Sequence, residues 1–158
     1  MGHESNATML FGHLETRANR IDHMLRLRDV QDKAIKNKKG GFNAFIPLVY
    51  QRNNNYLKIK EFLGSVEILK TFAISRLMLD NIKHIKAYWA TTTINLALVA
   101  QEFGCDDLDG TIEKESIQSS AGASSDKGTQ VGDFIELIKT SGFIPVERDS
   151  LYNEIKVY

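Results

Sequence analysis

Reactive side chains follow four short apolar runs of this chain, each at the point where the run gives way to polar sequence. The clearest case is residues 7–11, which are followed by Gly12, His13, Leu14 and Glu15. A histidine at such a position can shuttle a proton or donate a hydrogen bond to a carboxylate. We predict His13 and Glu15 as catalytic candidates; the competing interpretation is a loop histidine satisfied by backbone groups.

The third and fourth runs end in side chains that can bind a ligand. Trp89 closes the run at 85–88, where its ring could stack on a planar ligand or simply pack in the core. Asp109 and Thr111 follow the short run at 107–108 and can hydrogen-bond to a ribose or a carboxylate. Both types are also common helix N-caps, so a structural role is an equal alternative.

Several other polar residues are candidates for binding. Thr8 alternates with Met9, so the two side chains lie on opposite faces of a strand. Arg76 lies beside an apolar stripe, where it can meet a substrate or pair with Asp80 one turn later. Two residues of the tail can reach a carboxylate through a guanidinium and a phenol, or pin the tail to the domain: Arg148 and Tyr152.

The repeated order of strand, polar tip and helix is typical of an α/β barrel. In such barrels the chemistry lies at the carboxyl ends of the strands, where the loops meet. The expected strands are residues 6–11, 42–49, 85–89 and 106–111, and the expected helices are 16–35, 65–80, 93–103 and 131–141. Four units are half of a closed eight-stranded barrel, so the fold class we predict is an α/β half-barrel with a C-terminal helix and tail.

Some local expectations refine this outline. Pro47 lacks a backbone donor, so the second strand should be irregular or unpaired near its end. In the helix at 65–80, the inward stripe should contain five apolar residues: Val66, Leu69, Phe72, Ala73 and Leu77. We expect one domain over residues 1–158, in which the Ser- and Gly-rich stretch at 119–129 is a mobile loop rather than a linker.

Composition excludes several classes of protein. The 158 residues carry 20 basic and 20 acidic side chains, so no charge imbalance attracts nucleic acid or an anionic membrane. No apolar run approaches the ~20 residues of a membrane span, and the first residues do not resemble a signal peptide. Cys105 is the single cysteine, which rules out a disulfide framework and predicts an inert thiol and no metal site. We expect a cytoplasmic protein.

The ordered motifs of the chain resemble the menaquinone-pathway radical S-adenosylmethionine enzymes. The resemblance rests on seven blocks, at residues 6–16, 20–28, 40–48, 75–81, 84–89, 106–111 and 146–153. Three motifs look like the aminofutalosine synthase branch: Ala87-Tyr88-Trp89, Asp107-Leu108-Asp109-Gly110-Thr111 and Pro145-Val146-Glu147-Arg148-Asp149. The sister branch, the cyclic dehypoxanthinyl futalosine synthases, tends to vary all three and stays an alternative.

The resemblance implies a reaction and its cofactors. An adenosyl radical from S-adenosylmethionine adds to a carboxyvinyloxy-benzoate, and a [4Fe–4S] cluster serves the complete enzyme. In that setting His13 and Glu15 are expected to be catalytic. Four residues are expected near the cofactor, namely Thr8, Trp89, Asp109 and Thr111, and three near the substrate, namely Arg76, Arg148 and Tyr152.

The chain departs from the family in one large respect. Family members ligate the cluster through a Cys-x3-Cys-x2-Cys loop, because three thiolates hold three irons, and this sequence has no such loop. The chain therefore looks like the C-terminal half of the enzyme, whose partner is an N-terminal half-barrel, and it should be inactive alone. The rival hypothesis is a non-catalytic half-barrel that self-associates as a dimer and binds a ligand.

Overall fold

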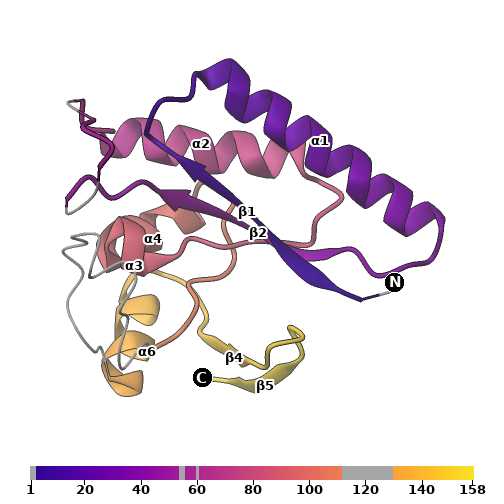
Figure 1. The fold of residues 1–158 in the computed structure, drawn as a ribbon. Helices are drawn as coiled ribbons and strands as arrows, with labels where there is room; N and C mark the ends of the chain where they lie inside the picture. Colours follow the sequence, from indigo (N-terminus) through magenta and orange to yellow (C-terminus); the bar gives the residue numbers. More distant parts are fainter. Residues whose placement is uncertain (1–2, 54–55, 60, 112–129) are drawn as a thin grey trace.

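The computed structural model describes residues 3–53, 56–59, 61–111 and 130–158 as a mixed α/β structure (Figure 1). Its main sheet has three parallel strands in sequence order, β1 (Ser5–Phe11), β2 (Phe42–Val49) and β3 (His84–Ile85). A single parallel bridge from Lys86 to Asp107 extends this order to the segment after α4 (Ile94–Gln101). The predicted strand at 106–111 is thus reduced to one bridging residue, although its place beside the third strand is as expected.

The alternation of β1 decides which face of the sheet is buried. Ala7, Met9 and Phe11 are at most 5% exposed, whereas Thr8 between them is exposed. Because side chains alternate along a strand, these two sets lie on opposite faces. The register places Thr8 opposite Ile46, so the same alternation runs across the sheet.

Two long helices cover one face of the sheet (Figure 1), and Met9 and Phe11 belong to the core that these helices share with it. The first, α1 (Arg17–Lys36), begins at a capping box in which Thr16 and Asn19 bond to each other's backbone N–H groups. The second is α2 (Ser65–Met78), which lies beside α1 and contacts β2 and β3. The core between helices and sheet is built on fully buried side chains, among them Met24, Phe45 and Phe72.

The predicted inward stripe of α2 is only partly right. Phe72 is fully buried, but Val66 and Leu77 are 67% and 80% exposed. The helix instead turns Thr71 and Ser75 inward, at 4% and 0% exposure. Their hydroxyls donate to the carbonyls of Glu67 and Thr71 one turn earlier, which satisfies the polar groups inside the core.

The predicted third strand is too long. β3 ends at Ile85, and Trp89 begins a short helix, α3 (Trp89–Thr92), which is followed by α4 (Ile94–Gln101). Ile85 and all four residues of α3 are buried, so burial continues through the change of structure. A short apolar run cannot by itself distinguish a buried strand from a buried helix.

Pro47 does not interrupt the pairing of β2 with β1, so the predicted irregularity is wrong there, whereas the end of β2 is unpaired on the edge that faces β3. It is buried and lies opposite Met9 within an unbroken register that continues to Val49. The carbonyl of Phe45, two residues earlier, accepts a hydrogen bond from the Lys86 N–H. Because backbone groups two residues apart point to the same side of a strand, the nitrogen of Pro47 also lies on the edge that faces β3. The last β2–β3 pair is Phe45 with Ile85, and the donor that proline lacks falls beyond it.

The C-terminal part forms a helix and a hairpin at the far side of α3 and α4 from β1 (Figure 1). Helix α6 (Val131–Thr140) buries Phe134, and β4 (Val146–Arg148) pairs antiparallel with β5 (Glu154–Val157). The predicted loop at 119–129 lies outside the described residues. Within the described ranges, no helix is both long and apolar enough to cross a membrane.

Candidate functional site

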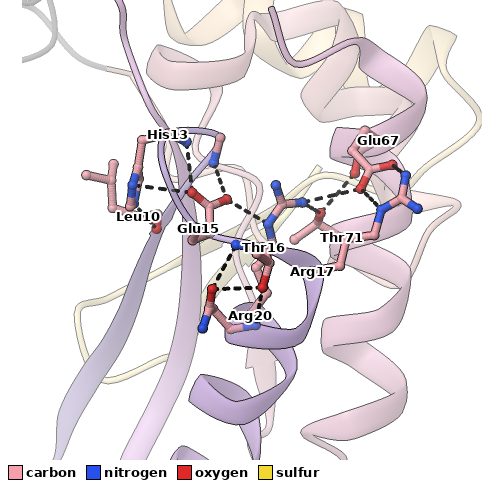
Figure 2. Close-up of polar contacts among 10 residues, drawn as sticks. Leu10, His13, Glu15, Thr16, Arg17, Arg20, Glu67 and Thr71 are labelled. Atoms are coloured by element: carbon pink, nitrogen blue, oxygen red, sulfur yellow. Dashed lines mark hydrogen bonds and ion pairs between the residues drawn. The ribbon is translucent and has the colours of Figure 1, made fainter. Parts of the chain in front are cut away.

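His13 lies in a tight turn between β1 and α1, and Glu15 holds that turn together. Gly12 has a φ of 89°, a conformation that favours glycine. The Glu15 carboxylate accepts hydrogen bonds from the backbone N–H groups of Gly12 at 2.6 Å and His13 at 2.8 Å (Figure 2). The position of His13 therefore depends on a carboxylate two residues away.

The imidazole of His13 has neighbours on both ring nitrogens. Its Nε2 lies 3.2 Å from the carbonyl oxygen of Leu10, and its Nδ1 lies 3.3 Å from Oε2 of Glu15 (Figure 2). The ring of Tyr50 meets it edge-on at 5.8 Å between centroids. The side chain is still 27% exposed, so an oriented imidazole stays open to a ligand at the strand tip.

Glu15 is in turn anchored to both helices by a buried arginine. Nε of Arg20 donates to Glu15 at 2.8 Å, and its guanidinium also reaches Thr71 and Glu67 on α2 (Figure 2). Burial raises the pKa of the Glu15 carboxyl, but hydrogen bonds from Gly12, His13 and Arg20 outweigh it and leave the pKa below its ordinary value. An ionised carboxylate with three donors fits a positioning role better than that of a base.

A second polar cluster lies on the other face of the sheet from Met9. Register and alternation place Lys86 on the face that carries Thr8 and Ile46. The Lys86 side chain is only 7% exposed, and its Nζ lies 2.5 Å from Asp109 and 3.7 Å from Asp107. Neither Lys86 nor Asp107 was predicted, although a lysine inside the apolar run at 85–88 is a signal that sequence reasoning could have used.

Arg148 joins this cluster from the C-terminal hairpin. Its guanidinium lies 2.6 Å from Asp107 and 3.7 Å from Asp109. Burial raises the pKa of the Asp107 carboxyl, but Lys86, the N–H of Asp109 and Arg148 lower it further than burial raises it. Two cations and two carboxylates thus alternate, and we call Lys86, Asp107, Asp109 and Arg148 the four-charge cluster.

Tyr152 ties the hairpin to β3 through ring contacts. Its ring stacks on the His84 ring at 4.1 Å between centroids. The guanidinium carbon of Arg148 lies 4.1 Å from the centroid of the Tyr152 ring. Burial raises the pKa of the Tyr152 hydroxyl, and the charge of Asp107 raises it further. The backbone of Tyr152 has a φ of 65°, an unusual conformation for an aromatic residue.

Arg76 makes structural contacts and not the expected pair with Asp80. Asp80 pairs with Arg28, while Arg76 lies 3.1 Å from Asp106 and donates to the carbonyl of Gly104 at 2.8 Å. Helix periodicity alone suggested the neighbour one turn away, but Arg76 instead extends toward the segment that follows α4. Its guanidinium fastens α2 to the carboxyl side of α4.

Trp89 is buried behind residues that line a cavity, whereas Thr111 lines the cavity itself. The Trp89 indole is 3% exposed, donates to the carbonyl of Gly110 at 2.8 Å and packs near Phe134, which matches the core-packing alternative. Thr111 is exposed and lines a cavity of about 660 Å³. Other residues around the same cavity are His84, Asp107, Asp109, Arg148 and Tyr152.

The structure thus brings the predicted residues into two groups. His13 and Glu15 form one, at the tip of β1, and Asp109, Thr111, Arg148 and Tyr152 surround the cavity. Thr8 is exposed on the face opposite Met9, as predicted. Arg76 and Trp89 are held by structural contacts.

Cys105 is not suited to bind iron. Its thiol is 5% exposed, and burial raises its pKa, which disfavours the thiolate that metals bind. Within the described ranges, no group of three or more His, Cys, Asp or Glu side chains is placed to hold a metal ion. The residues present therefore do not fit an iron–sulfur cluster, which needs three thiolates from one loop.

Comparison with known proteins places these motifs in a family. The model of the CofH/MqnC C-terminal region matches residues 39–157, which is most of the chain. The chain belongs to this family. The match includes β2, β3, the four-charge cluster and the C-terminal hairpin, whereas the His13 turn precedes it.

Individual relatives of the CofH/MqnC C-terminal family cover the whole chain. It is 44% identical over 162 residues to the aminodeoxyfutalosine synthase of Thermus thermophilus, covering 100% of this chain and 42% of the relative. It is 39% identical to the cyclic dehypoxanthine futalosine synthase of Streptomyces coelicolor, with 100% and 38% covered. A 5-amino-6-(D-ribitylamino)uracil–L-tyrosine 4-hydroxyphenyl transferase of Methanococcoides burtonii is 35% identical, with 99% and 44% covered. The chain thus spans less than half the length of these relatives.

Proposed function

We propose that this chain supplies the C-terminal half-barrel of a radical S-adenosylmethionine aminofutalosine synthase. The observation that carries the proposal is the 44% identity to the Thermus thermophilus synthase over the full chain. The parallel strands in sequence order, with helices on one face, are compatible with half of an eight-stranded barrel. The substrate we propose is a carboxyvinyloxy-benzoate, which accepts the adenosyl group.

In this proposal, the residues that bind the iron–sulfur cluster and S-adenosylmethionine belong mainly to an N-terminal half and not to this chain. Cys105 is its single cysteine and is buried, so the cluster needs thiolates from an N-terminal half. The face that carries Thr8 and Lys86 is proposed to be the wall that closes over the substrate. We propose a cytoplasmic location for the assembled enzyme.

Within this wall we propose distinct roles for the two groups. His13 is oriented by Leu10 and Glu15 and is partly exposed, so it can donate a hydrogen bond or move a proton at the strand tip. Glu15 acts through the turn that positions His13. Thr8, Asp109 and Thr111 carry polar groups toward the cofactor, and Arg148 and Tyr152 carry them toward the substrate. For Arg76 and Trp89 the proposed role is to hold the segments that bear these groups.

The test is complementation in vitro. The chain is mixed with the N-terminal part of the Thermus thermophilus relative, reconstituted with iron and sulfide, and assayed for aminofutalosine by mass spectrometry. We expect product from the mixture and none from either part alone, and we expect iron–sulfur absorbance only where the N-terminal part is present.

Two variants sharpen this assay. His13→Gln should lower turnover strongly, whereas His23→Gln, on the exposed side of α1, should leave it unchanged. Product from the chain alone, or a cluster absorbance on the chain alone, contradicts the proposal. A stable homodimer that does not combine with the N-terminal part supports the non-catalytic alternative instead.

A further inference from the structure

The four-charge cluster contains one carboxylate that differs from the other in how firmly it is held. Asp107 accepts the N–H of Asp109 at 2.9 Å as well as Arg148, and its side chain is 9% exposed. The Asp109 side chain is 33% exposed. Among the described residues its side chain pairs with cations alone, Lys86 at 2.5 Å and Arg148 at 3.7 Å. Asp107 is therefore the fixed member and Asp109 the exchangeable one.

The backbone at Asp109 also favours movement. Asp109 and Gly110 both have a φ of 86°, and a Cβ added at Gly110 would meet open space. A left-handed conformation at a non-glycine residue is strained and persists only when its surroundings hold it. The surroundings that hold Asp109 are the two cations, so a competing anion would release it.

Asp109 also separates a buried cation from the cavity. Asp109 and Arg148 line the 660 Å³ cavity, whereas Lys86 is not among its lining residues. Removal of the Asp109 carboxylate would leave Lys86 and Arg148 facing the single charge of Asp107. The position of Asp109 Oδ1, 2.5 Å from one cation and 3.7 Å from the other, is then a site for another carboxylate oxygen.

We infer that Asp109 is an internal stand-in for a ligand carboxylate, and that Lys86 and Arg148 bind that carboxylate once Asp109 swings away. This inference rests on the proposed function for the identity of the ligand, an aromatic carboxylate of the benzoate class. It adds Lys86 as a substrate-binding residue, and it makes Asp109 the competitor of the substrate carboxylate in place of the cofactor-facing role proposed above. Apolar residues of the same cavity, among them Leu108 and Phe134, can receive the ring.

The fluorescence of Trp89 can report the displacement of Asp109 by a ligand carboxylate. Trp89 is the single tryptophan, and its indole N–H donates to the carbonyl of Gly110, the residue after Asp109. Movement of Asp109 should shift Gly110 and change the Trp89 emission. Titration of the chain with benzoate can therefore be followed by tryptophan fluorescence, with benzamide as the neutral probe of the same shape.

We expect Asp109→Asn to bind benzoate about tenfold more tightly than the natural chain, because the competing charge is gone. Asparagine tolerates the left-handed backbone, so the loop keeps its shape. Lys86→Met should weaken benzoate binding at least tenfold, whereas Lys139→Met, on the exposed side of α6 and away from the cavity, should not change it. Benzamide should leave the emission of every variant unchanged.

A gain in benzoate affinity in the Asp109→Asn variant cannot result from misfolding. The inference therefore stays testable even where Lys86→Met fails to fold. Equal benzoate affinity in the natural chain and Asp109→Asn, or equal binding of benzamide, overturns it. The titration needs neither cluster nor cofactor. Failure of the proposed synthase activity would therefore appear in the complementation assay and not here.

Discussion

Replacement of Glu15 by glutamine tests whether the His13 turn is held by a single carboxylate. Glu15 accepts from Gly12, His13 and Arg20 at 2.6, 2.8 and 2.8 Å, and its side chain is 11% exposed. Glutamine keeps one acceptor oxygen, and its NH₂ group faces a donor. With hydrogen bonds to a charged group worth about 1.5–3 kcal/mol each, we expect Glu15→Gln to lower the free energy of unfolding by about 3 kcal/mol.

The assay is urea denaturation at pH 7, followed by far-ultraviolet circular dichroism. The matched control is Glu102→Gln, an exposed glutamate after α4, for which we expect a change below about 0.5 kcal/mol. A Glu15→Gln change no larger than that of Glu102→Gln would refute the assignment of Glu15 as the group that holds the turn.

The pH dependence provides an independent check with a fixed sign. Folding lowers the pKa of Glu15 below its ordinary value of 4.5, so the stabilisation is fully present above pH 4.5. It is lost as the pH falls through the pKa of the folded state. The gap between the natural chain and Glu15→Gln should therefore narrow as the pH falls below 4.5, and a constant or widening gap contradicts the reasoning.

Two further predictions concern stability. Phe72→Ala should cost about 3–5 kcal/mol in urea denaturation because the ring is fully buried, whereas Leu77→Ala, 80% exposed on the same helix, should cost less than about 0.5 kcal/mol; equal costs would reject the observed helix face. Gly104→Ala should lower the melting temperature more than Gly110→Ala. Both have positive φ, but only at Gly104 does the new Cβ come within 2.7 Å of Arg76; a smaller effect at Gly104 would contradict the packing.

Local periodicity predicted those elements whose burial alternates clearly. The strand at 6–11 differs from β1 by one residue, and the helix at 16–35 differs from α1 by one residue at each end. In the strand, the apolar alternation agrees with the Gly12 that follows, and in the helix, the apolar spacing agrees with the Thr16 cap and with the glycines at 40 and 41. These signals act over a few residues, so the sequence contains them fully.

The errors arose where distant segments decide the outcome. Thr71 and Ser75 are polar in the sequence but are buried, and the Thr71 hydroxyl accepts a hydrogen bond from Arg20 of α1, 51 positions earlier. Arg76 bonds to residues after α4, about 30 positions along the chain, and not to its helical neighbour. The four-charge cluster needs β3, the segment after α4 and the hairpin to meet, which no local pattern contains.

Trp89 shows a third kind of difference. An apolar run predicted a strand through this residue, and the chain remains buried there, but the backbone has already turned into α3. The hydrophobicity of this run correctly predicted that it is buried, but it did not determine whether the backbone is a strand or a helix. The Gly110 carbonyl that accepts the indole N–H lies 21 residues away in sequence, so this partner was hidden as well.

The parallel pairing of β1 with β2 has a consequence for how the chain acquires its structure. Because α1 lies between the two strands in the sequence, Phe11 can pair with Val49 only after the whole segment between them has been synthesised. Such distant pairings carry a loop-closure cost, which slows folding relative to helical proteins. During synthesis, Ala7, Met9 and Phe11 emerge before β2 and stay without that partner until it follows. Early protection of this segment by a chaperone would be expected to raise the yield of native protein.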